Sequence, residues 1–383
     1  MQVINKRSYD KQNNIVIMGA GVEAEKIYYS LHKCRNKVAF CLDNHKSGMF
    51  HGLHIRKPED ALEDLQRCVV LISSNKYYHE MGEQLRNLGL VEFKDYIKGR
   101  AYGKRIVYIN ANCYAQAYGK LLSSNSEFNE KYYVYYDTPL CDQESNIKSI
   151  VENCDICLSQ DVRENNKYGE TVSLEWHKKN IRKGCRLIVV PNLVGFGRAI
   201  FPQCVDNDEK NECEYDALPY GVFPFADAFV DGQVKIGKDV NAIIDTIVSG
   251  EPLNVQEIKS EYGRIFEEFK KREECWDIRI MDYVEKNIKT SKVMLDLRHP
   301  SSDVLKRIAS EILLKLGCED VEVPIDYTMD QYEIPVYPQV KRILGLKWDK
   351  RIKSSLLSLE DSLADINTYV RQYIYWCFER NQL

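Results

Sequence analysis

The chain has 383 residues, of which 44% are hydrophobic and 29% are charged, so it is too long for one ordinary core and predicts roughly two or three domains. The formal net charge of -4 argues against nucleic acid as the main partner. The 13 cysteines are odd in number and form no repeating framework, which predicts reduced thiols in a cytoplasmic protein. The polar start of the sequence and the lack of an apolar run of ~20 residues predict neither a signal peptide nor a transmembrane segment.

The first predicted elements are those of a nucleotide-binding half-fold. A buried strand over residues 14–20 runs into Gly19 and Gly21, which form a Gly-x-Gly-x-x-Ala turn at the start of a helix. Glycines let the backbone approach a phosphate, and the helix N-terminus supplies hydrogen-bond donors. A second strand over residues 38–42 ends in Asp43, whose carboxylate is placed to hold a ribose hydroxyl. The alternative is a half-fold of this type that binds no ligand.

Strands at residues 69–73 and 92–97, with a helix between them, complete only half of a dinucleotide-binding fold, which argues against NAD-dependent hydride transfer. The segments MGAGVEAEKI, CLDNHKSGMFHGLHIRKPEDAL and VVLISS resemble the N-terminal domain of bacterial sugar O-acyltransferases, over about residues 12–98. This resemblance implies a Rossmann-like domain that holds a nucleotide-sugar. We expect this domain to span residues 1–101 and a second domain to span residues 102–383.

The second domain is organised around the segment RIVYINANCYAQAYGKLL, residues 105–122. The apolar run from Ile106 to Ile109 predicts a buried strand, and a helical pattern resumes after Cys113. Free backbone N–H groups at a helix N-terminus favour negative charge and lower the pKa of a thiol placed there. Cys113 is therefore the candidate nucleophile. The alternative is a buried thiol that packs as a small hydrophobic side chain.

Further strands are predicted at residues 132–136, 155–158, 186–190 and 292–297. Helical patterns lie between these strands, which predicts an α/β domain with a mainly parallel sheet and many helices. In such sheets, ligands bind just beyond the carboxyl ends of the strands. The residues that follow the strands are Cys113, Gln160, Pro191, Asn192, Arg298 and His299. The sequence thus predicts a thiol, a base and carboxamides on one edge of the sheet.

Histidines are few in this domain. His177 and His299 are the two of the seven that lie there, and His299 alone follows a predicted strand. We expect His177 to be a surface residue and His299 to act as a general base. Asp296 lies three residues before His299 and is placed to orient it; this Asp-x-x-His spacing resembles the acid–histidine pair of GDSL-type esterases.

An ordered set of motifs resembles the WcbI-type polysaccharide biosynthesis acetyltransferase family over about residues 105–347. The motifs are INANCYAQ, CDICLSQDVRENNKYG, GCRLIVVPNLVGFGRAIFPQ, DIRIMDYVEKN, LRHPSSDVLKRIASEIL and YEIPVYPQVKRILGLKW. The resemblance implies a coenzyme A-binding acetyltransferase of capsule or surface polysaccharide synthesis, acting on a sugar or nucleotide-sugar. The family's motif residues fall on Asn112, Cys113, Gln160, Pro191, Asn192, His299 and Pro300. One departure is that Tyr114 and Ala115 separate Cys113 from Gln116, where the family has glutamine directly after cysteine.

The chemistry expected from these residues is acetyl transfer from a thioester to a sugar hydroxyl. Cys113 accepts the acetyl group, and His299 activates first the thiol and then the hydroxyl. The backbone N–H of Cys113, with Gln160 and Asn192, forms the oxyanion site. In a direct-transfer variant, Cys113 only shapes the pocket. Other functions left open are a thiol esterase or deacetylase using the same residues, and a non-catalytic nucleotide-sugar binding module.

Coenzyme A carries phosphates, which need cationic or amide partners near the sheet edge. The cofactor-binding candidates are Asn112, Lys104, Arg105, Arg198 and Arg298, with Lys306 and Arg307 further along the chain. Cys154 and Cys157 lie largely in a predicted strand and face opposite sides, and no second pair stands at ligand spacing. We therefore expect no metal site.

The remaining segments predict a loop and several helices. Residues 203–218 form an acidic insertion of low apolar content, which predicts a solvated loop. Residues 240–287 and 354–378 have helical patterns. Within the last segment, core packing or a homodimer contact is expected for Tyr369, Tyr373, Trp376 and Cys377, which stand at helical spacing.

Overall fold

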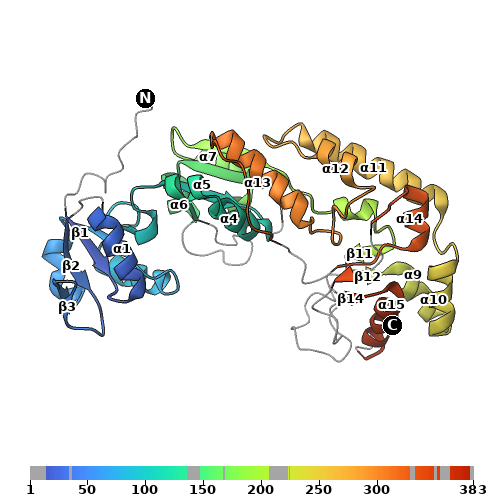
Figure 1. Cartoon of the computed structure of the whole chain (residues 1–383), viewed down its shortest axis with the longest axis horizontal. Coiled ribbons are helices and arrows are strands. Elements are labelled where there is room, and N and C mark those ends of the chain that lie inside the picture. The colour runs from blue at the N-terminus through green and yellow to red at the C-terminus, as the bar shows by residue number, and fades with distance from the viewer. Residues whose placement is uncertain are drawn as a thin grey trace. The chain divides into compact units, whose positions relative to one another are not determined.

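The computed structural model describes residues 14–33, 37–135, 147–166, 169–206, 223, 225–327, 333–348, 352–353 and 363–379. It is a mixed α/β structure with a mainly parallel sheet and many helices, which confirms the predicted fold class (Figure 1). Two compact units are formed. The first contains residues 1–110, 126–158 and 164–187, and the second contains residues 111–125, 159–163 and 188–383. The predicted division into domains at residue 101 stays a prediction.

The first sheet lies in the first unit. Its strands, in spatial order, are β3 (Gly48–Phe50), β4 (Leu53–Arg56), β2 (Val38–Leu42), β1 (Ile15–Met18), β5 (Val69–Ile72) and β6 (Tyr96–Lys98). Only β3 pairs antiparallel with its neighbour among these strands. The connecting helices are α1 (Val22–Lys33), α2 (Leu62–Leu65) and α3 (Tyr78–Asn87). Because β1 and β5 are buried along their whole length, both read as continuous apolar runs in the sequence.

The strand predicted at residues 92–97 is shorter and begins later than expected. Backbone N–H groups of Lys94 and Asp95 donate to the carbonyl oxygen of Val91, at 3.2 and 2.8 Å, and close a turn there. Phe93 within this turn has a positive φ of 61°. The chain becomes extended only at Tyr96, where β6 starts.

The second sheet has the spatial order β10, β9, β7, β8. Its strands are β7 (Arg105–Asn110), β8 (Tyr132–Tyr135), β9 (Ile156–Gln160) and β10 (Arg186–Val190), close to the predicted positions. Between them run α4 (Tyr114–Ser124), α5 (Ser126–Lys131), α6 (Ile147–Asn153) and α7 (Leu174–Asn180). The alternation of strands and helices places the carboxyl ends of β7, β9 and β10 just before the predicted site residues.

The strand predicted at residues 292–297 is wrong. The segment forms a tight turn with one isolated bridge between Met294 and Pro300. The side chain of Asp296 accepts the backbone N–H groups of Arg298 and His299, at 2.6 and 2.7 Å. The N–H of Leu295 donates to the carbonyl oxygen of His299 at 2.8 Å. A carboxylate thus satisfies the donors that a strand would have given to its neighbour.

The surface position predicted for His177 is also wrong. Its side chain is fully buried and stacks on Tyr108, with ring centroids 5.8 Å apart. Its Nδ1 lies 2.8 Å from the carbonyl oxygen of Ser173. Burial lowers the pKa of His177, although the bond to Ser173 acts in the opposite direction. His177 is therefore a core residue of the first unit.

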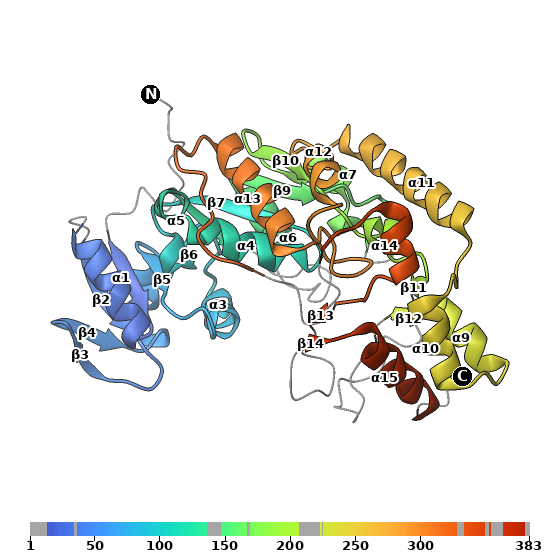
Figure 2. The ribbon, with the colours of Figure 1, turned by 45° about the vertical axis from the view of Figure 1, so that its right-hand side comes forward.

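The second unit is mostly helical. Its helices beyond α4 are α9 (Ala228–Lys235), α10 (Val240–Ser249), α11 (Val255–Glu273), α12 (Met281–Asn287), α13 (Ser302–Leu316), α14 (Pro338–Leu344) and α15 (Ile366–Glu379). Short strands pair as β11 (Cys204–Asp206) with β12 (Phe225–Asp227) and β13 (Ile352–Lys353) with β14 (Leu363–Ala364). Helices α4 and α13 lie side by side (Figure 2). The second unit also contains the short 3₁₀ helix η5 (Phe196–Ala199). The first unit contains three more, which are η2 (Glu59–Ala61), η3 (Gly99–Ala101) and η4 (Glu170–Val172).

The C-terminal helix packs as a core element. Tyr369, Tyr373, Trp376 and Cys377 are all at most 4% exposed, which confirms core packing at this helix face. Most of the acidic insertion predicted at residues 203–218 lies outside the described residues, which stop at residue 206 and resume at 223. Among the helices that are described, none is long and apolar enough to cross a bilayer.

Candidate active site

Cys113 lies between the end of strand β7 and the start of helix α4, as the sequence predicts. It is the N-cap residue of α4, and its thiol is exposed. Asn112 shapes the turn: its side-chain oxygen accepts the N–H of Tyr114 at 3.1 Å, and its carbonyl oxygen accepts the N–H of Ala115 at 2.9 Å. The alternative reading of Cys113 as a buried packing thiol is therefore wrong.

The thiol of Cys113 meets the imidazole of His299. The Sγ atom lies 3.3 Å from Nε2 of the ring, although the two residues are 186 positions apart. On the other side of the ring, Nδ1 lies 2.7 Å from Oδ2 of Asp296, which is 1% exposed. Sulfur, imidazole and carboxylate thus form a continuous hydrogen-bonded chain within the second unit.

Asp296 fixes both the position and the tautomer of His299. One carboxylate oxygen accepts the backbone N–H groups of Arg298 and His299, and the other faces Nδ1. An ionised carboxylate only accepts hydrogen bonds, so Nδ1 carries a proton and Nε2 is turned toward the sulfur. The turn that replaces the predicted strand is therefore what presents the base to the thiol.

The electrostatics of His299 favour its protonated form. Burial acts to lower the pKa, but the hydrogen bonds to Asp296 and Cys113 and their charges outweigh it and raise the pKa of His299 to about 10. A neighbouring carboxylate stabilises an imidazolium by Coulomb attraction and by accepting its proton. At neutral pH, His299 consequently holds a proton beside the sulfur.

Gly197 lets a second segment pack against this turn. A Cβ at position 197 would lie 2.1 Å from the carbonyl oxygen of Asp296 and 2.6 Å from Cα of Leu297. The neighbouring Gly195 donates its N–H to the carbonyl oxygen of Leu297 at 2.9 Å. Only glycine fits at position 197 without moving the acid that orients His299. Sequence reasoning missed this role, although the glycine-rich segment GFGRA marks it.

Gln160 joins three strand ends. Its Oε1 accepts the N–H of Asn112 at 3.1 Å, and its Nε2 donates to the carbonyl oxygen of Pro191 at 3.2 Å. The side chain is fully buried. The predicted convergence of these strand ends is therefore present. Because both ends of the amide bind backbone, the geometry fits a positioning residue better than the oxyanion donor expected from sequence.

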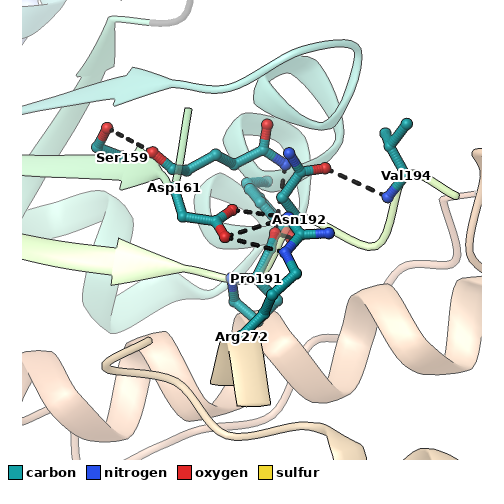
Figure 3. A network of polar contacts seen from close by, with 8 residues as sticks. Ser159, Asp161, Pro191, Asn192, Val194 and Arg272 are labelled. Atoms are coloured by element: carbon teal, nitrogen blue, oxygen red, sulfur yellow. Dashed lines mark hydrogen bonds and ion pairs between the residues drawn. The ribbon is translucent and has the colours of Figure 1, made fainter. Parts of the chain in front are cut away.

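Asn192 follows Pro191 at the end of β10. Its side-chain oxygen accepts the N–H of Val194 at 3.2 Å, which closes a turn into η5 (Figure 3). The side chain is half-buried. An amide oriented this way presents its nitrogen, the donor atom, away from the bond that its oxygen makes.

An ion pair that the sequence analysis missed borders these strand ends. Arg272 of α11 binds Asp161, the residue after Gln160, through two guanidinium nitrogens at 3.1 to 3.2 Å (Figure 3). The guanidinium also lies 4.7 Å from the ring centroid of Phe269 and 5.7 Å from that of Trp276. A two-point bond of this kind fixes the end of β9 against α11. The position of Asp161 in the motif CLSQD was the available signal.

Tyr114 was also missed. This residue, which replaces the glutamine expected after the cysteine, is fully buried, and its hydroxyl donates to the carbonyl oxygen of Arg298. It therefore ties the start of α4 to the turn that carries His299. Gln116, two residues on, is exposed and accepts a bond from the hydroxyl of Tyr327 at 3.3 Å.

The basic candidates separate into two groups. Arg298 is half-buried over the ring of Phe225, at 5.4 Å, and Arg198 is exposed in η5 beside Gly197. Both belong to the second unit, as the thiol does. These two residues remain candidates for phosphate contacts.

Lys104 and Arg105 do not belong to the thiol edge, which corrects the sequence expectation. They stand at the amino end of β7, and a strand of six residues spans about 20 Å, with Cys113 beyond its carboxyl end. Lys104 donates to the carbonyl oxygen of Asn129, and Arg105 lies 5.5 Å from the ring centroid of Tyr132. Closeness in sequence was misleading here because an extended strand separates the residues.

The glycine turn of the first sheet is formed as predicted. Gly19 has a φ of 95°, and a Cβ there would lie 2.5 Å from the hydroxyl oxygen of Ser73. At Gly21, which precedes α1, a Cβ would meet nothing within 4 Å. Glycine is thus required at the first position and tolerated rather than required at the second.

Asp43, which follows strand β2 of the first sheet, is hydrogen-bonded to the backbone of its own chain. Its carboxylate accepts the N–H groups of Ala20, His45 and Lys46, each at 2.9 Å. Burial acts to raise the pKa of Asp43, but these bonds outweigh it and lower the pKa. Lys46 in turn donates through Nζ to the carbonyl oxygen of Ala20 at 2.6 Å. The binding of a ribose hydroxyl by Asp43 stays a prediction.

Comparison with known proteins gives a match over most of the second sheet and its helices. A family model described as "Polysaccharide biosynthesis enzyme WcbI" matches residues 106–321, more than half of the chain. One similar solved structure is described as native WcbI, a polysaccharide biosynthesis enzyme, without a disulfide bond between CoA and a cysteine. It is 18% identical, with a TM-score of 0.56, and the match covers 72% of this chain and 90% of that one, a likeness of fold. No curated protein matches the chain.

Proposed function

Because the chain belongs to the WcbI family of polysaccharide biosynthesis enzymes, we propose that it is a coenzyme A-dependent O-acetyltransferase of a sugar or nucleotide-sugar. The observation that carries this proposal is the chain of contacts from Cys113 through His299 to Asp296. An exposed sulfur, a base at hydrogen-bond distance and a buried acid behind it are the parts that acyl transfer through a cysteine requires. The solved WcbI structure, whose description mentions CoA, supports the same acyl donor.

His299 moves protons in this proposal. With the proton of the thiol held on Nε2 of His299, the sulfur of Cys113 attacks the thioester carbonyl, the carbon–sulfur bond to coenzyme A breaks, and Nε2 protonates the departing thiolate. The neutral ring then takes the proton of the sugar hydroxyl as its oxygen attacks the acyl carbon, and the bond between that carbon and the sulfur of Cys113 breaks. Asp296 keeps Nδ1 protonated throughout and stabilises the charged ring.

The oxyanion would be held by backbone and carboxamide donors. The N–H of Cys113 stands at the N-terminus of α4, where backbone donors are free of helix partners. The side-chain nitrogen of Asn192 supplies the second donor. Gln160 binds the backbone of both Asn112 and Pro191, the residues that precede Cys113 and Asn192. It thereby keeps the spacing between the donor groups of Cys113 and Asn192.

Acetyl-CoA supplies the activated acyl group, and the phosphates of the donor would be met by Arg298, Arg198 and Asn112. The arginine pair belongs to the same unit as the thiol, and each carries a permanent charge. A nucleotide-sugar is proposed to bind at the glycine turn of residues 19–21, which directly precedes α1.

The test is transfer of a labelled acetyl group from acetyl-CoA to a panel of nucleotide-sugars. Wild-type protein is expected to label the sugar, Cys113→Ala to lose the activity, and Cys275→Ala to keep it, because Cys275 is exposed but stands elsewhere. Release of free acetate without labelled sugar would identify an esterase instead. Unchanged product formation by both Cys113→Ala and His299→Ala in a glycan-synthesis assay would identify a binding module.

A further inference from the structure

Two cysteines that the acyl-transfer proposal does not use lie against each other in the first unit. The Sγ atoms of Cys154 and Cys185 are 3.5 Å apart. Cys154 stands between α6 and β9, and Cys185 directly precedes β10. A disulfide bond is about 2.05 Å long, so the two sulfurs must approach by about 1.5 Å to form one. Both residues are at the amino ends of their strands, away from the strand ends that carry Gln160 and Asn192.

The backbone around the pair is held by independent bonds. Arg182 donates through Nε to the carbonyl oxygen of Cys154 at 2.8 Å, and the N–H of Cys185 donates to the carbonyl oxygen of Arg182 at 3.0 Å. The guanidinium of Arg182 also pairs with the carboxylate of Asp155. The N–H of Arg186 donates to the carbonyl oxygen of Asp155 at 2.9 Å. These bonds hold the backbone at Cys154 and Cys185 in place, and with it the two neighbouring sulfurs.

The two thiols have unequal surroundings. Cys154 is fully buried, and Cys185 is half-buried beside a guanidinium. The hydrogen bond from Cys154 lowers the pKa of Cys185; burial opposes this, and Arg182 and the N–H of Cys157 reinforce it. The same bond and burial raise the pKa of Cys154. The thiolate therefore forms first on Cys185, the more accessible of the two. In a dithiol of this kind, Cys185 is the attacking thiol and Cys154 the resolving thiol.

We propose that Cys154 and Cys185 form a redox-active dithiol that is converted to an intramolecular disulfide by low-molecular-weight disulfides. The thiolate of Cys185 attacks one sulfur of the small disulfide, which breaks its S–S bond and releases one small thiolate. The thiol of Cys154 then loses its proton to that thiolate and attacks the mixed disulfide at Cys185. A second small thiolate leaves, so the protein loses two electrons and the small disulfide gains them.

Other cysteines of the described residues do not offer this geometry. Cys157 is fully buried within β9, and Cys113 and Cys275 are exposed without a neighbouring sulfur contact. They are expected to form mixed disulfides or to stay reduced. Cys154 and Cys185 are thus expected to differ from the other cysteines in the rate of oxidation and in its product, which is an intramolecular disulfide. This proposal does not depend on the acyl-transfer proposal.

The experiment uses the full chain equilibrated in glutathione buffers of increasing oxidised fraction. Free thiols are blocked in acid, and unreduced tryptic peptides are sequenced by tandem mass spectrometry. We expect a peptide bridged between Cys154 and Cys185, with no glutathione attached, that disappears on reduction. Cys185→Ser is expected to lose the bridge, and Cys275→Ser, the matched control at another accessible thiol, to keep it.

The wild-type result alone decides the matter if a variant folds poorly. Fragment ions must place the bond on Cys154 rather than Cys157, and the oxidised protein is expected to unfold at higher temperature than the reduced one. Glutathione attached to Cys185 without any bridge, even in the most oxidised buffer, would overturn the proposal. A bridge between Cys154 and Cys157 would overturn it as well.

Discussion

The end of strand β2 in the first sheet and the turn that carries His299 each contain a carboxylate, but the atoms of the two carboxylates are used differently. At the first sheet, the carboxylate of Asp43 accepts the backbone N–H groups of Ala20, His45 and Lys46. In the turn that carries His299, the carboxylate of Asp296 also accepts backbone donors, but one oxygen remains for the ring of His299. That ring presents its other nitrogen to an exposed thiol.

The difference shows what makes such a carboxylate part of a reactive site. An acid that binds only backbone donors stabilises a loop. The same acid with a histidine between it and the solvent can support proton transfer. The comparison therefore predicts large chemical effects for substitutions at the second edge and mainly structural effects at the first.

The largest effect is expected at the sulfur. Cys113→Ala should reduce acetyl transfer by about 10³-fold or more, because it removes the nucleophile. Thermal unfolding should hardly change, since Cys113 is exposed. Activity within about threefold of wild type would favour the direct-transfer variant, in which the sulfur only shapes the pocket. The matched control is Cys275→Ala.

Substitution of the acid should rank next. Asp296→Asn keeps an oxygen for the turn but places an amide N–H opposite Nδ1, which moves the ring proton to Nε2 and blocks its role as a base. Acetyl transfer should fall by about 10² to 10⁴-fold in kcat, with KM for acetyl-CoA little changed. A change confined to KM would assign Asp296 to donor binding instead.

A moderate effect is expected at Tyr114. Tyr114→Phe removes the hydroxyl that binds the carbonyl oxygen of Arg298 and leaves the ring in place. The free energy of unfolding should fall by about 1 to 2 kcal/mol, and kcat by about 3 to 10-fold. The rate of Cys113 alkylation at fixed pH should change in the variant, because the turn that holds His299 is less well fixed. A stability loss without any change in that rate would make Tyr114 a purely structural residue.

The raised pKa of His299 predicts how the free energy of unfolding changes with pH. A pKa raised to about 10 in the folded protein means that folding stabilises the proton on His299. This stabilisation is complete below the pKa of a histidine in the unfolded chain, about 6.5, and is lost as the pH rises through about 10. The unfolding free energy of wild type minus that of His299→Gln should therefore shrink from pH 6 to pH 10, as denaturant titrations would show. A constant difference would contradict the raised pKa.

The smallest chemical effect is expected at the first edge. Asp43→Asn removes charge from three backbone contacts and should lower the free energy of unfolding by about 1 to 2 kcal/mol. The rate of Cys113 alkylation should stay as in wild type. A large loss of affinity for nucleotide-sugars, with unchanged stability, would show instead that the carboxylate binds a ligand.

The predictable parts of this fold are those encoded locally. Buried parallel strands such as β7 and β10 read as apolar runs, so the residues after them could be assigned to one edge. The run before His299 is apolar too, but it forms a turn, because the Asp296 carboxylate takes the donors that a strand would share. No pattern along the chain distinguishes these cases.

Contacts between distant segments could not be predicted. Gly197 packs on the backbone of Asp296, and Arg272 reaches Asp161 from another helix. Each residue has an ordinary neighbourhood in sequence, and its role arises only when the chain folds back. The same reason explains the error at Lys104, which is near Cys113 in sequence but stands at the opposite end of a strand.

The most direct measurement is peptide mass analysis of the protein after brief exposure to acetyl-CoA without an acceptor. We predict one acetyl group on the peptide that carries Cys113, its loss on addition of the acceptor sugar, and much slower labelling in His299→Gln. Sugar acetylation at full rate with no acetyl group ever found on Cys113 would contradict it.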